Sequence, residues 1–108
     1  MPVKIVVLYP HPNDPQRFER AYFGEHMPLM RSAVAPAART PTFKILGARA
    51  PFYRMAEVHY PDLAALRADV QSESGLARRH SSEKLSTGGQ PIFLVCQADP
   101  WDEQNPPR

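Results

Sequence analysis

The chain opens with a run of β-branched and aliphatic residues from Val3 to Tyr9, which is typical of a β-strand. The next segment, 10–13, contains two prolines and therefore predicts a loop. Asp14 followed by Pro15 predicts a helix start, because a carboxylate accepts from free N–H groups and proline is tolerated at the first helical position.

After Pro15, apolar residues recur every three or four positions. They give one broad apolar helix face, made of Phe18, Tyr22, Phe23, His26, Met27, Leu29, Met30 and Val34. Pro28 interrupts this helix, because its ring cannot donate a hydrogen bond to the carbonyl of Gly24 and crowds it. We therefore expect a kink or break between Gly24 and Pro28, with His26 inside it.

The rest of the chain alternates between strand and helix patterns. It predicts a loop at 35–41, strands at 42–47 and 52–60 joined by a turn at 48–51, a helix capped by Asp62 and ended at 72–75, a further helix at 76–85, a turn at 87–90 and a last strand at 91–98. Leu63, Leu66 and Val70 are expected on the buried side of the helix that Asp62 caps.

This order of elements predicts an α+β fold of the ferredoxin-like βαββαβ type, an antiparallel sheet with both helices on one face. Residues 1–98 form the single expected domain. The tail 99–108 has three prolines and no periodicity, so we expect it to be flexible or draped over a partner.

Two of the predicted strands are apolar on both sides. In the first strand both alternations are apolar, and in the last strand Ile92 and Leu94 alternate with Phe93 and Val95. Strands of this kind are buried on both faces. Since the helices cover only one face, a second copy of the sheet is the simplest cover for the other, which predicts a homodimer.

The motifs of the N-terminal half resemble the EthD family. They are Tyr9-Pro10, Asn13-Asp14-Pro15, Phe18 and Tyr22-x-x-x-His26-x-Pro28-Leu29, together with Thr87-Gly88-Gly89 before the last strand. The resemblance spans nearly all of residues 2–98. The sequence departs from the family pattern in the alanine- and proline-rich loop 35–41 and at Phe23, where a second tyrosine would be expected.

The resemblance implies a dimeric α+β barrel. Members of the family are associated with catabolic genes, and the founding ones with degradation of ethyl tert-butyl ether alongside a cytochrome monooxygenase. Proteins of similar fold include small monooxygenases, cyclases, isomerases and haem-dependent enzymes, so the fold alone selects none of these activities.

The charge and composition of the chain limit the kinds of partner that we expect. The net charge is +2, from 13 basic and 11 acidic residues, and the basic residues form no stripe. Arg78 and Arg79 are the densest pair, and we expect them on a solvated helix face rather than on nucleic acid. Without a signal segment or a membrane-length apolar run, the sequence predicts a cytoplasmic protein with no membrane association.

The single cysteine, Cys96, lies in an apolar strand and is expected to be inert. No pair of histidines has the spacing of a helical metal motif, and no phosphate-binding glycine loop is present. We therefore expect no metal and no cofactor.

His26 is the expected catalytic residue. An imidazole titrates near neutral pH and can transfer a proton with little tuning. The alternative is a structural histidine that hydrogen-bonds a carbonyl freed near Pro28. Both readings place it on the apolar helix face.

The third strand suggests further ligand contacts. Ala56 and Val58 suit packing beneath helices, so the opposite side is expected to face the barrel interior and to line a partly polar cavity. That side consists of Tyr53, Met55, Glu57 and His59, of which we expect Tyr53, Glu57 and His59 to bind the ligand. Glu57 and His59 are expected to hydrogen-bond each other or partners on neighbouring strands. Tyr9 and Tyr22 are added as candidate ligand contacts, although packing is the commoner role of such residues.

Three functions remain open from the sequence. The first is an enzyme that acts without a cofactor on a small apolar or aromatic carbonyl compound, such as an isomerase, cyclase, decarboxylase or monooxygenase-like protein using His26. The second is a non-catalytic metabolite-binding protein or an accessory protein of an oxygenase. The third is a structural assembly domain whose barrel is filled by side chains.

Overall fold

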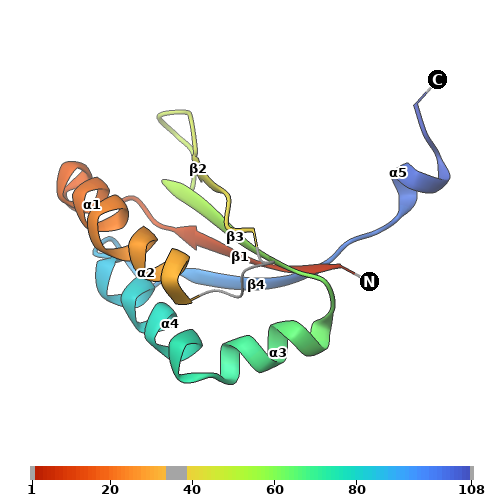
Figure 1. Ribbon diagram of the computed structural model, residues 1–108. Helices are drawn as coiled ribbons and strands as arrows, with labels where there is room; N and C mark the ends of the chain where they lie inside the picture. The colour runs from red at the N-terminus through yellow and green to blue at the C-terminus, as the bar shows by residue number, and fades with distance from the viewer. Residues whose placement is uncertain (1, 34–38, 108) are drawn as a thin grey trace.

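A four-stranded antiparallel sheet with helices on one face forms the body of the protein (Figure 1). The computed structural model describes residues 2–33 and 39–107. The strands are β1 (Val3–Tyr9), β2 (Thr42–Lys44), β3 (Arg54–Tyr60) and β4 (Ile92–Gln97), in the order β2-β3-β1-β4. The helices are α1 (Pro15–Ala21), the π-helical turn η1 (Tyr22–His26), α2 (Met27–Ala33), α3 (Leu63–Gln71), α4 (Glu73–Leu85) and α5 (Trp101–Gln104).

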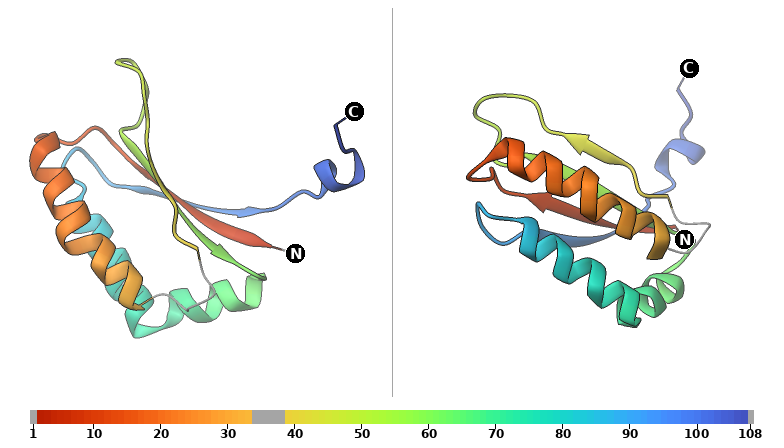
Figure 2. Two further views of the ribbon diagram at one scale, coloured as in Figure 1. Left: turned by 45° about the horizontal axis from the view of Figure 1, so that its top comes forward. Right: turned by 60° about the vertical axis from the view of Figure 1, so that its left-hand side comes forward.

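This arrangement confirms the ferredoxin-like α+β fold. β1 pairs with β3 and β4 on its two sides, and Val3 lies opposite both Tyr60 and Gln97. The continuous segment α1–η1–α2 runs beside α4 over the same face of the sheet (Figure 2). The other face has no helix over it in the part of the chain that the structure describes.

Each main helix begins at a side chain that caps it. Asp14 accepts from Arg17 N at 3.1 Å, as its place before Pro15 predicts. Asp62 does the same for α3 through Ala65 N at 2.8 Å. Ser72 ends α3 and at once caps α4, accepting from Gly75 N at 3.0 Å. The helix predicted to begin at residue 76 therefore begins at Glu73.

Pro28 does not break the first helix, contrary to the expected interruption. The chain widens into a π-helical turn instead, in which the N–H of Met27 donates to the carbonyl of Tyr22, five residues earlier. A single wide turn of this kind absorbs a position where the ordinary ladder cannot form. The helix resumes as α2, and His26 lies at the last position of the wide turn.

Two apolar clusters fill the space between sheet and helices. One is centred on Val3, Val58, Tyr60, Leu66 and Met30, and the other on Val7, Tyr9, Phe18, Tyr22 and Tyr53. Leu66 is buried as predicted. Leu63 and Val70, predicted on the same buried side, are 40% and 37% exposed, because α3 covers only the end of the sheet.

Two strands and the segments around them differ from the predicted ones. Strands β2 and β3 are shorter than the predicted strands 42–47 and 52–60. Most of the loop predicted at 35–41 lies outside the described residues, but Arg39 and Pro41 accept from the N–H groups of His59 and Glu57, both at 2.9 Å. At the other end of the chain, α5 projects beyond β4, away from the helix layer (Figure 1).

Candidate functional site

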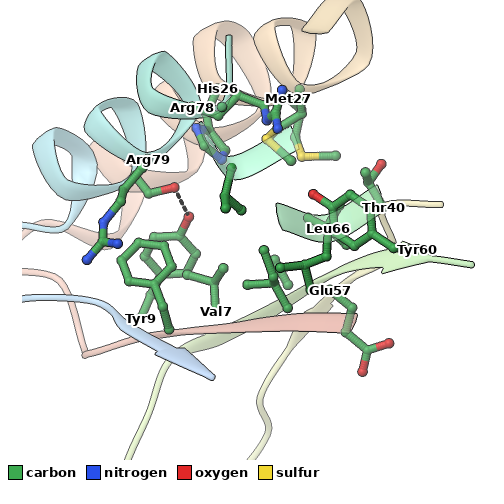
Figure 3. Close-up of a pocket in the computed structure, with 18 of the residues that line it drawn as sticks. Val7, Tyr9, His26, Met27, Thr40, Glu57, Tyr60, Leu66, Arg78 and Arg79 are labelled. Atoms are coloured by element: carbon green, nitrogen blue, oxygen red, sulfur yellow. Dashed lines mark hydrogen bonds between the residues drawn. The ribbon is translucent and has the colours of Figure 1, made fainter. Parts of the chain in front are cut away.

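A cavity of about 300 Å³ lies between the sheet and the helix layer (Figure 3). Its walls are mostly aliphatic and come from both layers. They include Ile5, Val7 and Val58 from the strands, and Met27, Met30 and Leu66 from the helices. A concave, mostly apolar site with a few polar groups is the usual form of a small-molecule site.

His26 is the buried imidazole of this cavity wall. Its side chain is carried by the wide turn before Pro28, is 3% exposed, and stacks at a tilt on the Tyr22 ring with centroids 5.3 Å apart. Nδ1 shares a hydrogen bond of 2.9 Å with Ser81 Oγ on α4. Burial lowers the pKa of His26 from 6.5 to about 4. The ring is therefore neutral at physiological pH, and the sequence-based expectation of a near-neutral pKa is wrong.

Tyr9 and Tyr22 contribute their side chains to the lining of the same cavity. Tyr9 OH donates to Ser82 Oγ at 3.0 Å, the bond drawn in Figure 3, and Tyr22 OH shares a hydrogen bond of 2.8 Å with Thr42 Oγ1, outside the lining. Burial raises the pKa of both phenols, so both stay protonated. The structure thus places Tyr9, Tyr22 and His26 around one cavity.

Arg78, a residue of the cavity lining, is part of an ion pair with Asp69. Arg78 donates to Asp69 Oδ2, and Tyr60 OH donates to the same oxygen. Burial and this hydrogen bond raise the pKa of Tyr60. Arg78 is only 6% exposed, so its predicted place on a solvated helix face is wrong, whereas its neighbour Arg79 is exposed.

Tyr53 lies apart from the cavity, contrary to its predicted role. It sits just before β3, where its ring packs edge-on against Phe18, and its hydroxyl donates to Glu19 Oε1 at 2.5 Å. Arg54 donates to both oxygens of Glu19 at 3.0 Å and lies over the rings of Tyr22 and Phe23. Burial raises the pKa of Tyr53 to about 12, with the Glu19 bond adding to it. This polar cluster of Tyr53, Glu19 and Arg54 packs against the Tyr22 ring through the guanidinium of Arg54.

The side chains of Glu57 and His59 lie on the helix-free face of the sheet. Ala56 and Val58 face the helices as predicted, and the cavity is on their side. Glu57 is one of the residues that line the cavity, but its carboxylate points away from it, and His59 is not part of the lining (Figure 3). The expected pairing of the two is confirmed, with Glu57 Oε1 2.7 Å from His59 Nε2. The hydrogen bond from His59 lowers the pKa of Glu57, and Lys4 at 3.1 Å adds to the effect.

The sequence reasoning missed Ser81, Ser82, Tyr60 and the Arg78–Asp69 pair. The two serines occupy neighbouring positions of α4 and reach His26 and Tyr9 respectively. Their only sequence signal was small polar side chains in a helix, which usually marks a solvated face.

Within residues 2–33 and 39–107, no group of three histidine, cysteine or acidic side chains is placed to hold a metal ion. No helix in this part of the chain is long and apolar enough to cross a membrane. The site can offer a neutral imidazole and protonated phenols to a ligand, and these groups can donate, accept or exchange protons.

Comparison with known proteins identifies relatives by structure. No family model matches the chain, and no curated protein matches it. An EthD family protein from Bacillus halodurans C-125 superposes with a TM-score of 0.81 and 29% identity, over 92% of this chain and all of the other.

Two more distant structures share the fold. A dimeric ferredoxin-like protein of unknown function from Jannaschia sp. CCS1 has a TM-score of 0.71 and 11% identity, over 91% of this chain and 100% of that one. SnoaB, a cofactor-independent oxygenase from Streptomyces nogalater, has a TM-score of 0.61 and 17% identity, over 90% and 92%. The motif around His26 and Pro28, the sheet order and the similarity to the Bacillus protein agree, and the chain has a ferredoxin-like fold and closely resembles the EthD family.

Proposed function

We propose that this protein binds a small, neutral, apolar or aromatic carbonyl-type metabolite in the cavity and acts on it by acid/base chemistry at His26, without a cofactor. The observation that carries the proposal is a buried imidazole whose Nδ1 is held by Ser81 at 2.9 Å while its ring borders an apolar cavity. A ring held in this way presents its other nitrogen to the ligand in a fixed orientation.

The charges around the cavity favour a neutral ligand. His26 is neutral because burial lowers its pKa to about 4. Arg78 is paired with Asp69, so the cavity has no excess charge from either residue. Arg79 also lines the cavity, and it is exposed and forms an ion pair with Glu83 at 3.4 Å. Taking an ionised ligand out of water costs more in an apolar site than taking a neutral carbonyl compound, which favours a ligand that is neutral when it binds.

Several reactions fit this arrangement: isomerisation, cyclisation, decarboxylation or an oxygen-dependent step. Each needs a proton removed from or delivered to a carbon or oxygen beside a carbonyl, which one positioned imidazole can do. SnoaB, a cofactor-independent oxygenase of the same fold, supports an activity of this class.

Ligand binding is tested first, by NMR on protein with ¹³C-labelled methionine methyls. Titration with a neutral aromatic ketone such as 2-acetylnaphthalene is expected to shift the signals of Met27 and Met30, which line the cavity. Met55 lies on the far face of the sheet, next to Leu8, and serves as the internal reference. Shifts that do not saturate, or that are equal at Met27, Met30 and Met55, contradict a cavity ligand.

Catalysis is tested on the carbonyl compounds that bind. His26→Gln keeps a neutral polar side chain of similar size, so it is expected to bind the ligand within about threefold and to lose at least tenfold in turnover. General acid/base groups typically contribute 10²–10⁴-fold. His11→Gln, in the exposed loop before α1 and outside the cavity lining, is the matched control and is expected to retain activity.

A non-catalytic metabolite-binding or accessory role is the second candidate. A base works best when its pKa is near the working pH, and the pKa of about 4 for His26 lies well below it. Saturable binding by the cavity with no turnover of any bound carbonyl, in wild type and His26→Gln alike, would favour this role.

We propose further that the protein is a homodimer joined through the helix-free face of the sheet. Ile92, Leu94 and Phe43, all on this face, are 41–44% exposed in the single chain. Leu8 lies between Ile92 and Met55, and Met55 lies beside Phe43, so the apolar side chains form a continuous row of the kind that soluble proteins usually cover. The dimeric state of the Jannaschia protein supports this arrangement.

A further inference from the structure

His26 borders two separate hollows, one on each side of the helix layer. The inner one is the apolar cavity described above. The outer one is a polar cleft of about 230 Å³ between η1 and α4, lined in part by Glu25, His80, Ser81 and Lys84. Glu25, His80 and Lys84 are exposed, so water reaches the outer cleft directly.

The hydrogen bond to Ser81 connects the imidazole to this outer cleft. Ser81 borders the outer cleft, and its Oγ lies 2.9 Å from His26 Nδ1. The neighbouring Ser82 faces the inner cavity instead, where it accepts from Tyr9. In the described part of the chain no hydrogen bond reaches Nε2, which lies across the ring from Nδ1 and so away from Ser81, and the imidazole itself borders the inner cavity (Figure 3).

We propose that His26 and Ser81 form a proton relay through the helix layer, which exchanges protons between a ligand in the inner cavity and water in the outer cleft. This inference rests on the proposed function and adds a route for the proton. In the relay, Ser81 positions the imidazole of His26 and passes the proton on to water in the outer cleft.

The relay conserves charge and changes no oxidation state. Nε2 accepts a proton from the ligand, Nδ1 passes its own proton to Ser81 Oγ, and the Ser81 hydroxyl proton passes to water in the cleft. The ligand is left as the anion and the water carries the proton. The reverse passage delivers a proton to another atom of the ligand and restores the original tautomer of His26.

A relay explains how a buried imidazole with a low pKa can still serve the ligand. Burial makes the doubly protonated ring unfavourable, so His26 is poorly suited to store a proton. In the relay one ring nitrogen gains a proton as the other loses one, so the ring need not become charged. The groups that face this path are Tyr22 from η1, Glu25, His80 and Lys84 at the cleft, and Tyr9, Tyr60, Arg78 and Arg79 around the inner cavity.

The test compares two variants of one shape. Ser81→Thr keeps the hydroxyl, whereas Ser81→Val has the same branching without it, so both change the helix backbone to a similar extent. The measurement is the rate at which the His26 ring N–H exchanges with water, followed by NMR on ¹⁵N-histidine-labelled full-length protein and assigned with His26→Gln. Naphthalene is added as a probe that fills the inner cavity without offering a proton.

We expect wild type and Ser81→Thr to exchange within about twofold of each other, with or without naphthalene. Ser81→Val is expected to exchange at least tenfold more slowly when naphthalene is bound. Equal exchange in the two variants would overturn the relay. Exchange in wild type that stops when naphthalene fills the cavity would also overturn it, because the proton would then leave through the cavity. If Ser81→Val does not fold, Ser81→Ala takes its place with the same expectation.

Failure of the relay is distinguishable from failure of the proposed function. The exchange rates are read on the protein itself and need no turnover. If naphthalene leaves the methyl signals of Met27 and Met30 unchanged, the cavity ligand is contradicted. The inner cavity is then not blocked, so the relay is judged in the free protein by the direction of the difference: slower exchange in Ser81→Val than in Ser81→Thr supports it, and equal rates overturn it.

Discussion

His26 takes its chemistry from its surroundings rather than from its residue type. The exposed His80, on α4, lies beside the same cleft, and His59 is held by Glu57 on the far face of the sheet. Only His26 is both buried and reached by the apolar cavity among the histidines that the structure describes. Its low pKa is therefore a property of the folded state, and folding and protonation must be linked.

The linkage predicts how stability depends on pH. Between pH 6.5 and 4 the unfolded chain binds a proton at His26 that the folded chain does not, so the contribution of this residue is complete above pH 6.5 and is lost as the pH falls toward 4. On lowering the pH from 7.5 to 5, wild type is expected to lose about 2 kcal/mol more in free energy of unfolding than His26→Gln. Urea denaturation at the two pH values measures both losses.

Other titratable groups contribute equally to the two losses, because wild type and His26→Gln share them. The difference between the two losses therefore reports on His26 alone. Equal losses in wild type and His26→Gln would mean that His26 is as easily protonated in the folded chain as in the unfolded one.

At the scale of elements, local signals predicted best what is local. The caps at Asp14 and Asp62 and the first strand were read correctly, because each depends on a few neighbouring residues. Pro28 was recognised as incompatible with a regular helix, but a proline alone does not say whether the chain breaks or widens. The packing of Tyr22 and His26 against the sheet and α4 keeps the helix continuous.

The candidate site was predicted in part for a similar reason. Alternation along β3 correctly separated Ala56 and Val58 from Glu57 and His59. It did not say which face holds a cavity, since that depends on how far the helices stand from the sheet. The burial of Arg78 could not be predicted for a related reason. Its partner Asp69 lies in the preceding helix α3, so the periodicity of α4 alone does not indicate the ion pair.

Two helical glycines allow a matched test of element packing. A Cβ at Gly24 would meet nothing within 4 Å, whereas one at Gly75 would lie 2.0 Å from the carbonyl oxygen of Asp69, where α3 turns into α4. Gly24→Ala is expected to raise the free energy of unfolding by about 0.5–1 kcal/mol, because alanine loses less backbone entropy in a helix. Gly75→Ala is expected to lower it by about 3 kcal/mol, because backbone must move.

Thermal denaturation followed by circular dichroism measures both changes. For a domain of this size each 1 kcal/mol corresponds to a shift in Tm of about 4–8 °C. A Gly75→Ala protein as stable as wild type would mean that the close approach of the two helices is not required.

At the scale of the whole molecule, the helices cover one face of the sheet, and the other is the face through which we propose that the dimer forms. Lys4, Glu57 and His59 form a paired polar group on that uncovered face, beside the apolar surface of Leu94 and Ile92. Polar side chains that already satisfy one another can be covered at a moderate cost, so this group is compatible with an interface.

Neighbouring residues of β4 test the dimer. Leu94 points to the helix-free face and is 43% exposed, while Val95 points to the helix side at the border of the cavity and is 62% exposed. Leu94→Lys is expected to convert the dimer into a monomer, because it places a charge in an apolar interface. Val95→Lys is expected to leave the dimer intact. Analytical ultracentrifugation of both variants and wild type measures the mass; a wild type that sediments as a monomer at all concentrations would refute the dimer.

The adjacent serines of α4 have a mechanical consequence. Ser81 is hydrogen-bonded to His26 and Ser82 to Tyr9, so α4 is linked to the wide turn η1 by one residue and to the central strand β1 by the next. A ligand large enough to push α4 away from the sheet would stretch both hydrogen bonds at once. The position of α4 therefore sets both the size of ligand that fits and the orientation of the imidazole. A molecule slightly too large would displace α4 and so misalign His26, and it would fail to react even if it could still enter the cavity.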